Sequence, residues 1–187
     1  MRPPHLVAII TGPSAVGKTA VAKGVLKKLK KFRPSVTYTT RDKRKKYSED
    51  KIMRYVTVRQ FRKLIKDNKL LEWARVYGNF YGSSAAALKR KLKKYHVLIN
   101  IDVQGAQIIK RKVKPVVSFF IKPDSINHLR QRLEARDMPK RDRKLRLRSA
   151  KLEIARAKIF DYQIINRQGK LAQTINQVIK ILKKHAS

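Results

Sequence analysis

Residues 6–19 read LVAIITGPSAVGKT, a short apolar run followed at once by a glycine-rich turn. From Gly12 to Thr19 the turn matches the pattern G-x-x-x-x-G-K-[ST] at each of its fixed positions. This pattern binds phosphate where it joins a strand to a helix, and here we expect a strand before it and a helix after it. The stretch therefore predicts a phosphate-binding loop at the end of a buried strand.

The residue types in this loop suit a nucleoside triphosphate. Gly12 and Gly17 allow the backbone to turn its N–H groups toward phosphate oxygens, and the start of the following helix adds the positive end of its dipole. Lys18 would reach the β- and γ-phosphates, and the hydroxyl of Thr19 would ligate Mg²⁺. The loop therefore predicts binding of ATP or GTP.

Strands and helices are expected to alternate along the rest of the chain. Residues 97–101 form a continuously apolar run, and residues 103–112 follow with helical spacing. Such alternation is typical of parallel βαβ units, and continuously apolar strands indicate a sheet that is covered on both faces. The sequence predicts a single-domain α/β fold with a central parallel sheet covered by helices.

Some local features can also be predicted. Residues 41–54 and 137–144 are mostly polar and interrupt the alternation, so we expect them to be inserts on the sheet rather than separate domains. A helix is expected over residues 145–160, a turn at residues 78–79, and Asp124 is expected to cap the helix that follows it.

The charge of the chain is unusual. Its 187 residues include 48 Lys and Arg against 12 Asp and Glu, which gives a formal net charge of +36. A charge of this size favours polyanionic partners, such as nucleotides or nucleic acid, without choosing among them. The chain has no cysteine, so disulfides and thiolate chemistry are excluded. It also lacks an apolar run long enough to span a membrane or a signal-peptide pattern, so we expect a cytoplasmic protein with no membrane partner.

Several further segments resemble guanylate kinases, in the order and spacing of that family. They are SVTYTTR at residues 35–41 with Arg44 after it, LEWA at 71–74, YGNFYGS at 77–83, IDVQGA at 101–106, RLEAR at 132–136 and FDYQIIN at 160–166. Together with the loop they cover nearly the whole chain. The resemblance implies the reaction ATP + GMP ⇌ ADP + GDP with Mg²⁺.

The resemblance also implies an internal organisation of the P-loop kinase fold. A core would comprise about residues 1–34, 86–135 and 148–187. A small mixed α/β subdomain of about residues 35–85 would bind GMP, and a short lid would occupy about residues 136–147.

The same resemblance implies a set of site residues. ATP would be bound by the loop and one later residue, namely Gly12, Pro13, Ser14, Ala15, Val16, Gly17, Lys18, Thr19 and Asn166. GMP would be bound by Thr37, Arg41, Arg44, Glu72, Tyr81, Ser83 and Asp102. Catalysis would use Lys18, Arg41, Arg132, Arg136 and Arg146. Thr19 and Asp102 would hold the metal.

These residue types suit the implied reaction. The planar guanidinium groups of Arg41 and Arg44 can hold a phosphate bidentately. Glu72 can accept from guanine N1–H and N2–H₂ together, whereas adenine has no such pair of donors on that edge. A structural interpretation also stands for two of these residues: Glu72 could pair with a nearby arginine, and Asp102 could cap the helix that begins at Val103.

The chain departs from the family pattern at several positions. Met53 stands where the family has a tyrosine that touches the GMP phosphate, and Tyr47 and Tyr55 are the candidates to replace it. Asn100 stands where the family has the first acid of a D-x-D pair. Ala15 replaces a loop glycine, and we expect no effect from that change.

Two other functions are compatible with the pattern. One is a related kinase that acts on a different phosphorylated acceptor, such as a ribose bisphosphate. The other is a non-catalytic basic binding module, although the intact Lys18 and Thr19 argue against it. Nonspecific, salt-sensitive binding of nucleic acid or another polyanion could accompany any of these functions, because basic residues cover the helices around residues 27–31 and 89–94.

Overall fold

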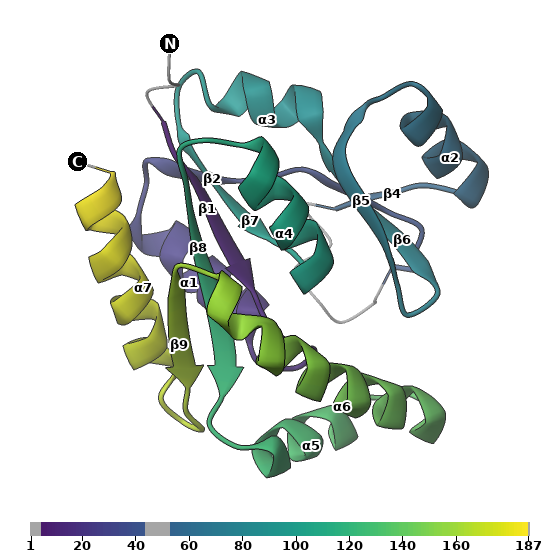
Figure 1. The fold of residues 1–187 in the computed structure, drawn as a ribbon, viewed down its shortest axis with the longest axis vertical. Helices are drawn as coiled ribbons and strands as arrows, with labels where there is room; N and C mark the ends of the chain where they lie inside the picture. Colours follow the sequence, from purple (N-terminus) through teal and green to yellow (C-terminus); the bar gives the residue numbers. More distant parts are fainter. Residues whose placement is uncertain (1–4, 44–52, 187) are drawn as a thin grey trace.

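A five-stranded parallel sheet forms the centre of the molecule (Figure 1). The computed structural model describes residues 5–43 and 53–186, and the fold is given for those residues. The order of the strands across the sheet is β2 (Phe32–Pro34), β7 (His96–Asn100), β1 (Val7–Thr11), β8 (Val116–Pro123) and β9 (Tyr162–Asn166). β1 lies in the middle, and all five of its residues are buried. The predicted α/β fold with a central parallel sheet is confirmed.

Helices cover both faces of this sheet, and the alternation of side chains along β1 shows how. Ala8 and Ile10 belong to an apolar cluster with α1 (Lys18–Lys28) and α7 (Leu171–His185). Val7 and Ile9 belong to a second cluster on the opposite face. That second cluster includes α3 (Ala85–Lys91) and α4 (Val103–Lys112). Residues of both sets are fully enclosed, which is why the strand reads as continuously apolar.

A second sheet of four strands lies beside the first (Figure 1). Its order is β4 (Met53–Tyr55), β3 (Thr37–Thr39), β6 (Asn79–Ser84) and β5 (Leu70–Val76). β3 is parallel to β4 and antiparallel to β6, so this sheet is mixed. The short helix α2 (Val58–Lys66) packs against it through Phe61, which is fully buried and stacks on Phe80.

Two helices run below the carboxyl ends of the central strands, on the side of the molecule where β1 ends (Figure 1). They are α5 (Ile126–Glu134) and α6 (Lys140–Ala155), and a 3₁₀ turn, η2 (Arg156–Ile159), connects α6 to β9. Among the described helices none is long and apolar enough to cross a membrane.

Some local predictions were wrong. α6 begins at Lys140 rather than near residue 145, so most of the polar stretch 137–144 is helical. Only Ala150 of this helix is buried, which explains why apolar spacing did not reveal its start. Ser125, not Asp124, caps α5, because its hydroxyl accepts from the backbone N–H of His128.

Other details of the chain were also missed. The strands β2 and β4 were not predicted, because three-residue strands carry almost no periodic signal. The turn between β5 and β6 is centred on Tyr77 and Gly78, both with positive φ, rather than on residues 78–79.

Candidate nucleotide-binding cleft

The phosphate-binding loop connects β1 to α1, as predicted, and two of its glycines are required by the geometry. Gly12 has φ of +139°, and a Cβ there would collide with the carbonyl oxygen of Ile121. Gly17 has φ of +101°, and a Cβ there would lie 2.6 Å from Nδ2 of Asn166. Only glycine fits both constraints, so the neighbouring strands β8 and β9 press against the loop from behind.

Ala15 is not neutral for the backbone, contrary to the expectation from sequence. Its φ is +65°, in the left-handed region that alanine adopts only at a cost of about 1–2 kcal/mol. The loop holds this conformation without the glycine that suits it.

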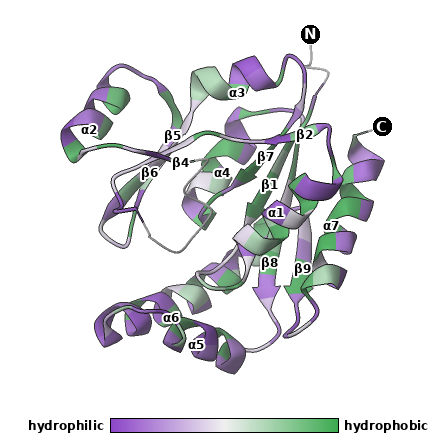
Figure 2. Cartoon of the chain, turned by 180° about the vertical axis from the view of Figure 1, so that it is seen from behind, coloured by the Kyte–Doolittle hydropathy of each residue, from purple (hydrophilic) through white to green (hydrophobic). Residues whose placement is uncertain are grey.

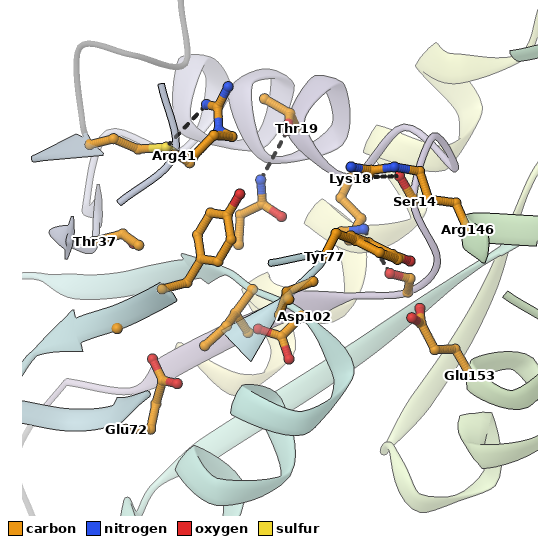
Figure 3. Close-up of a pocket in the computed structure, with 17 residues that line it drawn as sticks. Ser14, Lys18, Thr19, Thr37, Arg41, Glu72, Tyr77, Asp102, Arg146 and Glu153 are labelled. Atoms are coloured by element: carbon orange, nitrogen blue, oxygen red, sulfur yellow. Dashed lines mark hydrogen bonds between the residues drawn. The ribbon is translucent and has the colours of Figure 1, made fainter. Parts of the chain in front are cut away.

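Lys18 and Thr19 stand at the start of α1, inside the cleft (Figure 3). The ammonium group of Lys18 donates to the carbonyl oxygens of Gly12 and Pro13 at 2.7 and 2.8 Å. The hydroxyl of Thr19 accepts from the side-chain amide of Asn100 at 3.0 Å. Asn100 is thus in the place where a family acid would stand, and it contacts the residue that would ligate a metal.

The arginines predicted to act on ATP occupy three different positions. Arg146 of α6 reaches the loop, where it donates to Oγ of Ser14 at 3.1 Å and lies 4.0 Å above the ring of Tyr77. Arg132 of α5 lies behind the loop and donates to the carbonyl oxygen of Val16 and to Gln168. Arg136 follows α5 and is outside the set of residues that line the cavity.

Asn166 likewise supports the loop from behind. Its amide nitrogen donates to the carbonyl oxygen of Val16 at 2.8 Å, and its oxygen accepts from the hydroxyl of Thr174 at 3.0 Å. The side chain is buried and is not part of the cavity wall. Among these four predicted residues, the structure brings only Arg146 to the cavity.

The far side of the cavity is built by the second sheet. Four of the residues predicted to bind GMP line it, namely Thr37, Arg41, Glu72 and Tyr81. Arg44 and Tyr47 lie outside the described residues.

Met53 has no hydroxyl where the family has a tyrosine, but the hydroxyl of Tyr55 lies close to this position. The guanidinium of Arg41 donates to this hydroxyl at 3.3 Å and lies 3.7 Å from the sulfur of Met53. A phenolic group therefore accompanies Arg41 in this chain, although it comes from two residues later on the same strand.

Glu72 is a buried carboxylate, and only 4% of its surface is exposed. Its Oε1 accepts from the backbone N–H of Ser83 at 2.9 Å, across the register of β5 and β6. Burial raises the pKa of Glu72 from 4.5 to about 7, and nearby Asp102 acts in the same direction. The expectation that Glu72 pairs with an arginine finds no support among its described contacts; the group is held by backbone and faces the cavity.

Gly105 of α4 makes room for this carboxylate. A Cβ at Gly105 would lie 2.8 Å from Oε2 of Glu72 and 2.5 Å from Cδ1 of Ile101. Both distances are shorter than real Cβ contacts allow, so the side chains would have to move.

We expect Gly105→Ala to raise the KM for the nucleotide bound at Glu72 by about tenfold, because small displacements of a positioning group are costly. The KM for the nucleotide bound at the loop should stay the same, and this serves as the internal control. Steady-state kinetics with each substrate varied in turn would measure both. An equal change in the two KM values would contradict a specific effect on Glu72.

Asp102 has the local structural role that the sequence allowed. Its Oδ1 accepts from the backbone N–H groups of Gln104 and Gly105, at 2.9 and 3.0 Å, and so caps α4. The residue also lines the cavity between Lys18 and Glu72. A capping role and a role toward a ligand are therefore compatible.

The residues of the cavity wall that sequence reasoning missed include two titratable ones, Tyr77 and Glu153. Glu153 stands on α6 seven residues after Arg146, two helical turns on the same face, so this spacing was the available signal. Burial raises the pKa of Glu153 to about 7, Lys18 lowers it, and Asp102 raises it further. Burial and the nearby Glu153 also raise the pKa of the Tyr77 phenol.

The arrangement joins two subsites in one cavity (Figure 3). On one side are the loop and its lysine, which suit a triphosphate. On the other are Arg41, which suits a second phosphate, and Glu72, which suits a base with paired donors. The fold and the cavity together define a P-loop kinase.

Comparison with known proteins narrows this class. The sequence model of the guanylate kinase family matches residues 5–185. A guanylate kinase of Rickettsia prowazekii is 36% identical over 179 residues, covering 95% of this chain and 90% of that protein. One of Thermotoga maritima is 35% identical over 177 residues, covering 94% and 84%. The crystal structure of guanylate kinase from Anaplasma phagocytophilum has a TM-score of 0.80 at 29% identity, covering 100% and 88%. The chain belongs to the guanylate kinase family, which is a family of nucleoside monophosphate kinases.

Proposed function

We propose that this chain transfers the γ-phosphoryl group of ATP to GMP. The observation that carries the proposal is that Lys18 and Glu72 line the same cavity, from opposite sides. A lysine on a phosphate-binding loop selects the donor, and a buried carboxylate that faces paired N–H donors selects guanine. In this proposal residues 35–85 bind GMP, residues 136–147 form the lid, and the reaction takes place in the cytoplasm.

Phosphoryl transfer needs positioning and charge stabilisation more than a catalytic base. Lys18 would leave the carbonyl oxygens of Gly12 and Pro13 for the phosphates of ATP, which are stronger acceptors. Arg41 would hold the phosphate of GMP together with Tyr81 and with Tyr55, which replaces the missing tyrosine at Met53. Arg146 is already at the loop and would stabilise the transferring group.

The cavity also suits Mg²⁺. The part of the chain that the structure describes has no group of three or more His, Asp or Glu side chains placed to hold a metal. Mg²⁺ does not need such a cage, because it keeps several waters and binds through one or two oxygen groups plus substrate phosphates. Thr19 supplies a hydroxyl, Asp102 and Glu153 supply carboxylates nearby, and Asn100 would turn its amide oxygen to the ion or its waters. The ion would neutralise charge that develops between the phosphates.

Product identification tests this proposal. Purified protein incubated with ATP, GMP and Mg²⁺ is expected to form ADP and GDP in equal amounts, as resolved by ion-exchange chromatography. Omission of GMP or addition of a chelator should abolish both products. Formation of ADP without GDP would show simple ATP hydrolysis and would contradict the assignment.

The raised pKa of Glu72 makes GMP binding dependent on pH. Guanine donors require the ionised carboxylate, so affinity should be nearly full at pH 8 and fall progressively as the pH drops through 7. With a pKa of about 7, the Kd for GMP should rise about tenfold between pH 8 and pH 6. Calorimetric titration across this range would measure it. The GMP phosphate also titrates near pH 6, so Glu72→Gln is the control, and it should lack the part of the pH dependence that comes from Glu72.

The Glu72 carboxyl also affects the stability of the fold, but here the protonated form is the favourable one. Its pKa is higher in the folded chain than in the unfolded chain, so the folded state binds more protons between about pH 4.5 and 7. The contribution of Glu72 to the free energy of unfolding therefore falls as the pH rises through this window.

A further inference from the structure

The edge of the central sheet opposite the nucleotide cleft is strongly cationic. α1, α4 and α7 follow strands of this parallel sheet and return antiparallel to them, so they end at this edge, and α3 ends shortly before β7 begins there (Figure 1). Their last turns carry the basic residues Lys27, Lys28, Lys89, Arg90, Lys91, Lys110, Arg111, Lys112, Lys183, Lys184 and His185. None of these four helices contains an acidic residue.

The described acidic residues are distributed unevenly: Glu72, Asp102 and Glu153 line the cleft, and Glu134 and Asp142 stand on α5 and α6. At the opposite edge Asp161 precedes β9, and it is already engaged. Its carboxylate pairs with Lys110 at 2.6 Å and accepts from the backbone N–H and hydroxyl of Ser118. Favourable interaction of cations with the negative ends of the helix dipoles accounts for part of this pattern. It does not account for the shape of the surface.

A hollow of about 330 Å³ lies at this edge, between the turn that joins α1 to β2 and the end of α7. α1 and α7 lie side by side (Figure 2), and Lys28, the last residue of α1, donates to Oδ1 of Asn176 in the middle of α7 at 2.9 Å. Four exposed lysines stand around the hollow: Lys28, Lys30, Lys31 and Lys183. Its inner wall is formed by apolar and aromatic side chains: Leu29 and Ala186 are partly exposed, and Phe32, His96 and Leu182 lie buried beneath them. Among residues 5–43 and 53–186, no acidic residue lines it.

An apolar and aromatic floor with a cationic rim matches the chemistry of a single nucleic-acid strand. Such a strand presents a base to the apolar surface and phosphates to the cations around it. We propose that this hollow binds single-stranded nucleic acid, with one base on its floor and the flanking phosphates on its lysines. A duplex would not fit as well, because its bases are stacked inside and cannot enter a hollow of this size.

The surface beside the hollow also suits a single nucleic-acid strand. Arg33 of β2 lies 4.3 Å above the ring of Tyr95, which comes just before β7. Lys91 is close by and donates to the carbonyl oxygen of Pro34. Burial lowers the pKa of Lys91, and the neighbouring cations Arg90, Arg33 and Arg54 lower it further, which shows how closely positive charge is gathered here. A stacked guanidinium and phenol ring offers a second platform for a base.

This site is separate from the proposed kinase reaction. The hollow lies at the amino ends of β2 and β7, whereas the nucleotide cleft lies at the carboxyl ends of β1 and β7. Strand binding and phosphoryl transfer can therefore be measured independently.

Fluorescence anisotropy with a labelled single-stranded RNA of about 12 nucleotides tests the proposal. The triple variant Lys30→Gln, Lys31→Gln, Lys183→Gln should bind about tenfold more weakly than the unchanged protein in about 200 mM salt. The slope of log K against log salt should become shallower by about 2, since each lost contact with a single strand removes about 0.7. The matched control changes three exposed cations of α2, as Arg59→Gln, Arg62→Gln, Lys66→Gln, and should lose no more than about twofold.

Three results would overturn the proposal. An equal loss in both triple variants would show binding by overall charge alone. Competition by inorganic polyphosphate as effective as that by the RNA, at equal charge, would show that the apolar floor binds no base. If the lysine triple variant lost binding to anionic phospholipid vesicles but kept its binding to RNA, the surface would be assigned to a membrane. Unchanged thermal unfolding of both variants would confirm that they are folded, and because this readout needs no turnover, failure of the kinase assignment would not affect this test.

Discussion

Lys18→Ala is expected to lower kcat/KM for phosphoryl transfer by at least about 100- to 1,000-fold, the range typical for loss of one charge-stabilising group. The reason is geometric. The ammonium group of Lys18 already stands at the phosphate-binding loop, within 2.8 Å of its carbonyl oxygens, and would move only a short way to the phosphates. A coupled assay of ADP release would measure the loss.

Two further variants make this result interpretable. Removal of the ammonium leaves the carbonyl oxygens of Gly12 and Pro13 without a donor, which could destabilise the loop, so Lys18→Met keeps the stem and its packing. Lys27→Ala removes an equal charge from the exposed end of the same helix and should keep full activity. Comparable losses in Lys18→Met and Lys18→Ala, at unchanged thermal stability, are expected. Near-normal activity in Lys18→Met would contradict the role of the charge.

Glu72→Gln is expected to lower kcat/KM for GMP by about 100-fold or more, while the KM for ATP stays the same. A charged hydrogen bond contributes about 1.5–3 kcal/mol, and glutamine would also set its own NH₂ against one of the two guanine donors. The effect should be confined to GMP, because Glu72 lies on the second sheet, across the cavity from the loop.

The control for this variant is Glu134→Gln, the same chemical change on the exposed part of α5. It should leave both substrates unaffected. Glu72→Gln should not unfold the protein, since the neutral side chain removes a buried charge whose pKa burial has already raised. A parallel fall in kcat/KM for both substrates would contradict selection of guanine by Glu72.

The sequence predicted the parts of this molecule that depend on strong local patterns. The loop motif located Lys18 and Thr19, and the continuous apolar runs identified β1 and β7 as strands of a covered sheet. The resemblance to the family placed Arg41 and Glu72 in one site, and both line the cavity.

Other features depend on tertiary contacts that the sequence does not encode locally. Glu153 lines the cavity because α6 crosses below the carboxyl ends of the strands. The orientation of α6 could not be predicted, because the apolar residues of this helix show too little periodicity. Asn166 and Arg132 were predicted to act on ATP, yet in the structure both donate to the carbonyl oxygen of Val16 from behind the loop. The strain at Ala15 was also hidden, because φ follows from the folded loop rather than from the residue type.

The cations behind the net charge of +36 can be assigned to regions of the structure. A few cations, among them Lys18, Arg41 and Arg146, face the nucleotide cavity. Many others stand in the last turns of α1, α3, α4 and α7 at the opposite edge of the sheet, and four lysines surround the hollow between α1 and α7. The charge therefore serves the proposed kinase reaction only in part.

The most direct test of the kinase assignment is coupled ADP release with several acceptors in turn: GMP, dGMP, AMP and ribose 1,5-bisphosphate, with Lys18→Ala as the inactive control. The arrangement of Arg41 and Glu72 predicts turnover with GMP that exceeds turnover with AMP and with the sugar bisphosphate by at least about 100-fold in kcat/KM. Preferred turnover of the sugar bisphosphate, or no GMP-dependent ADP release by a protein that still binds ATP, would contradict it.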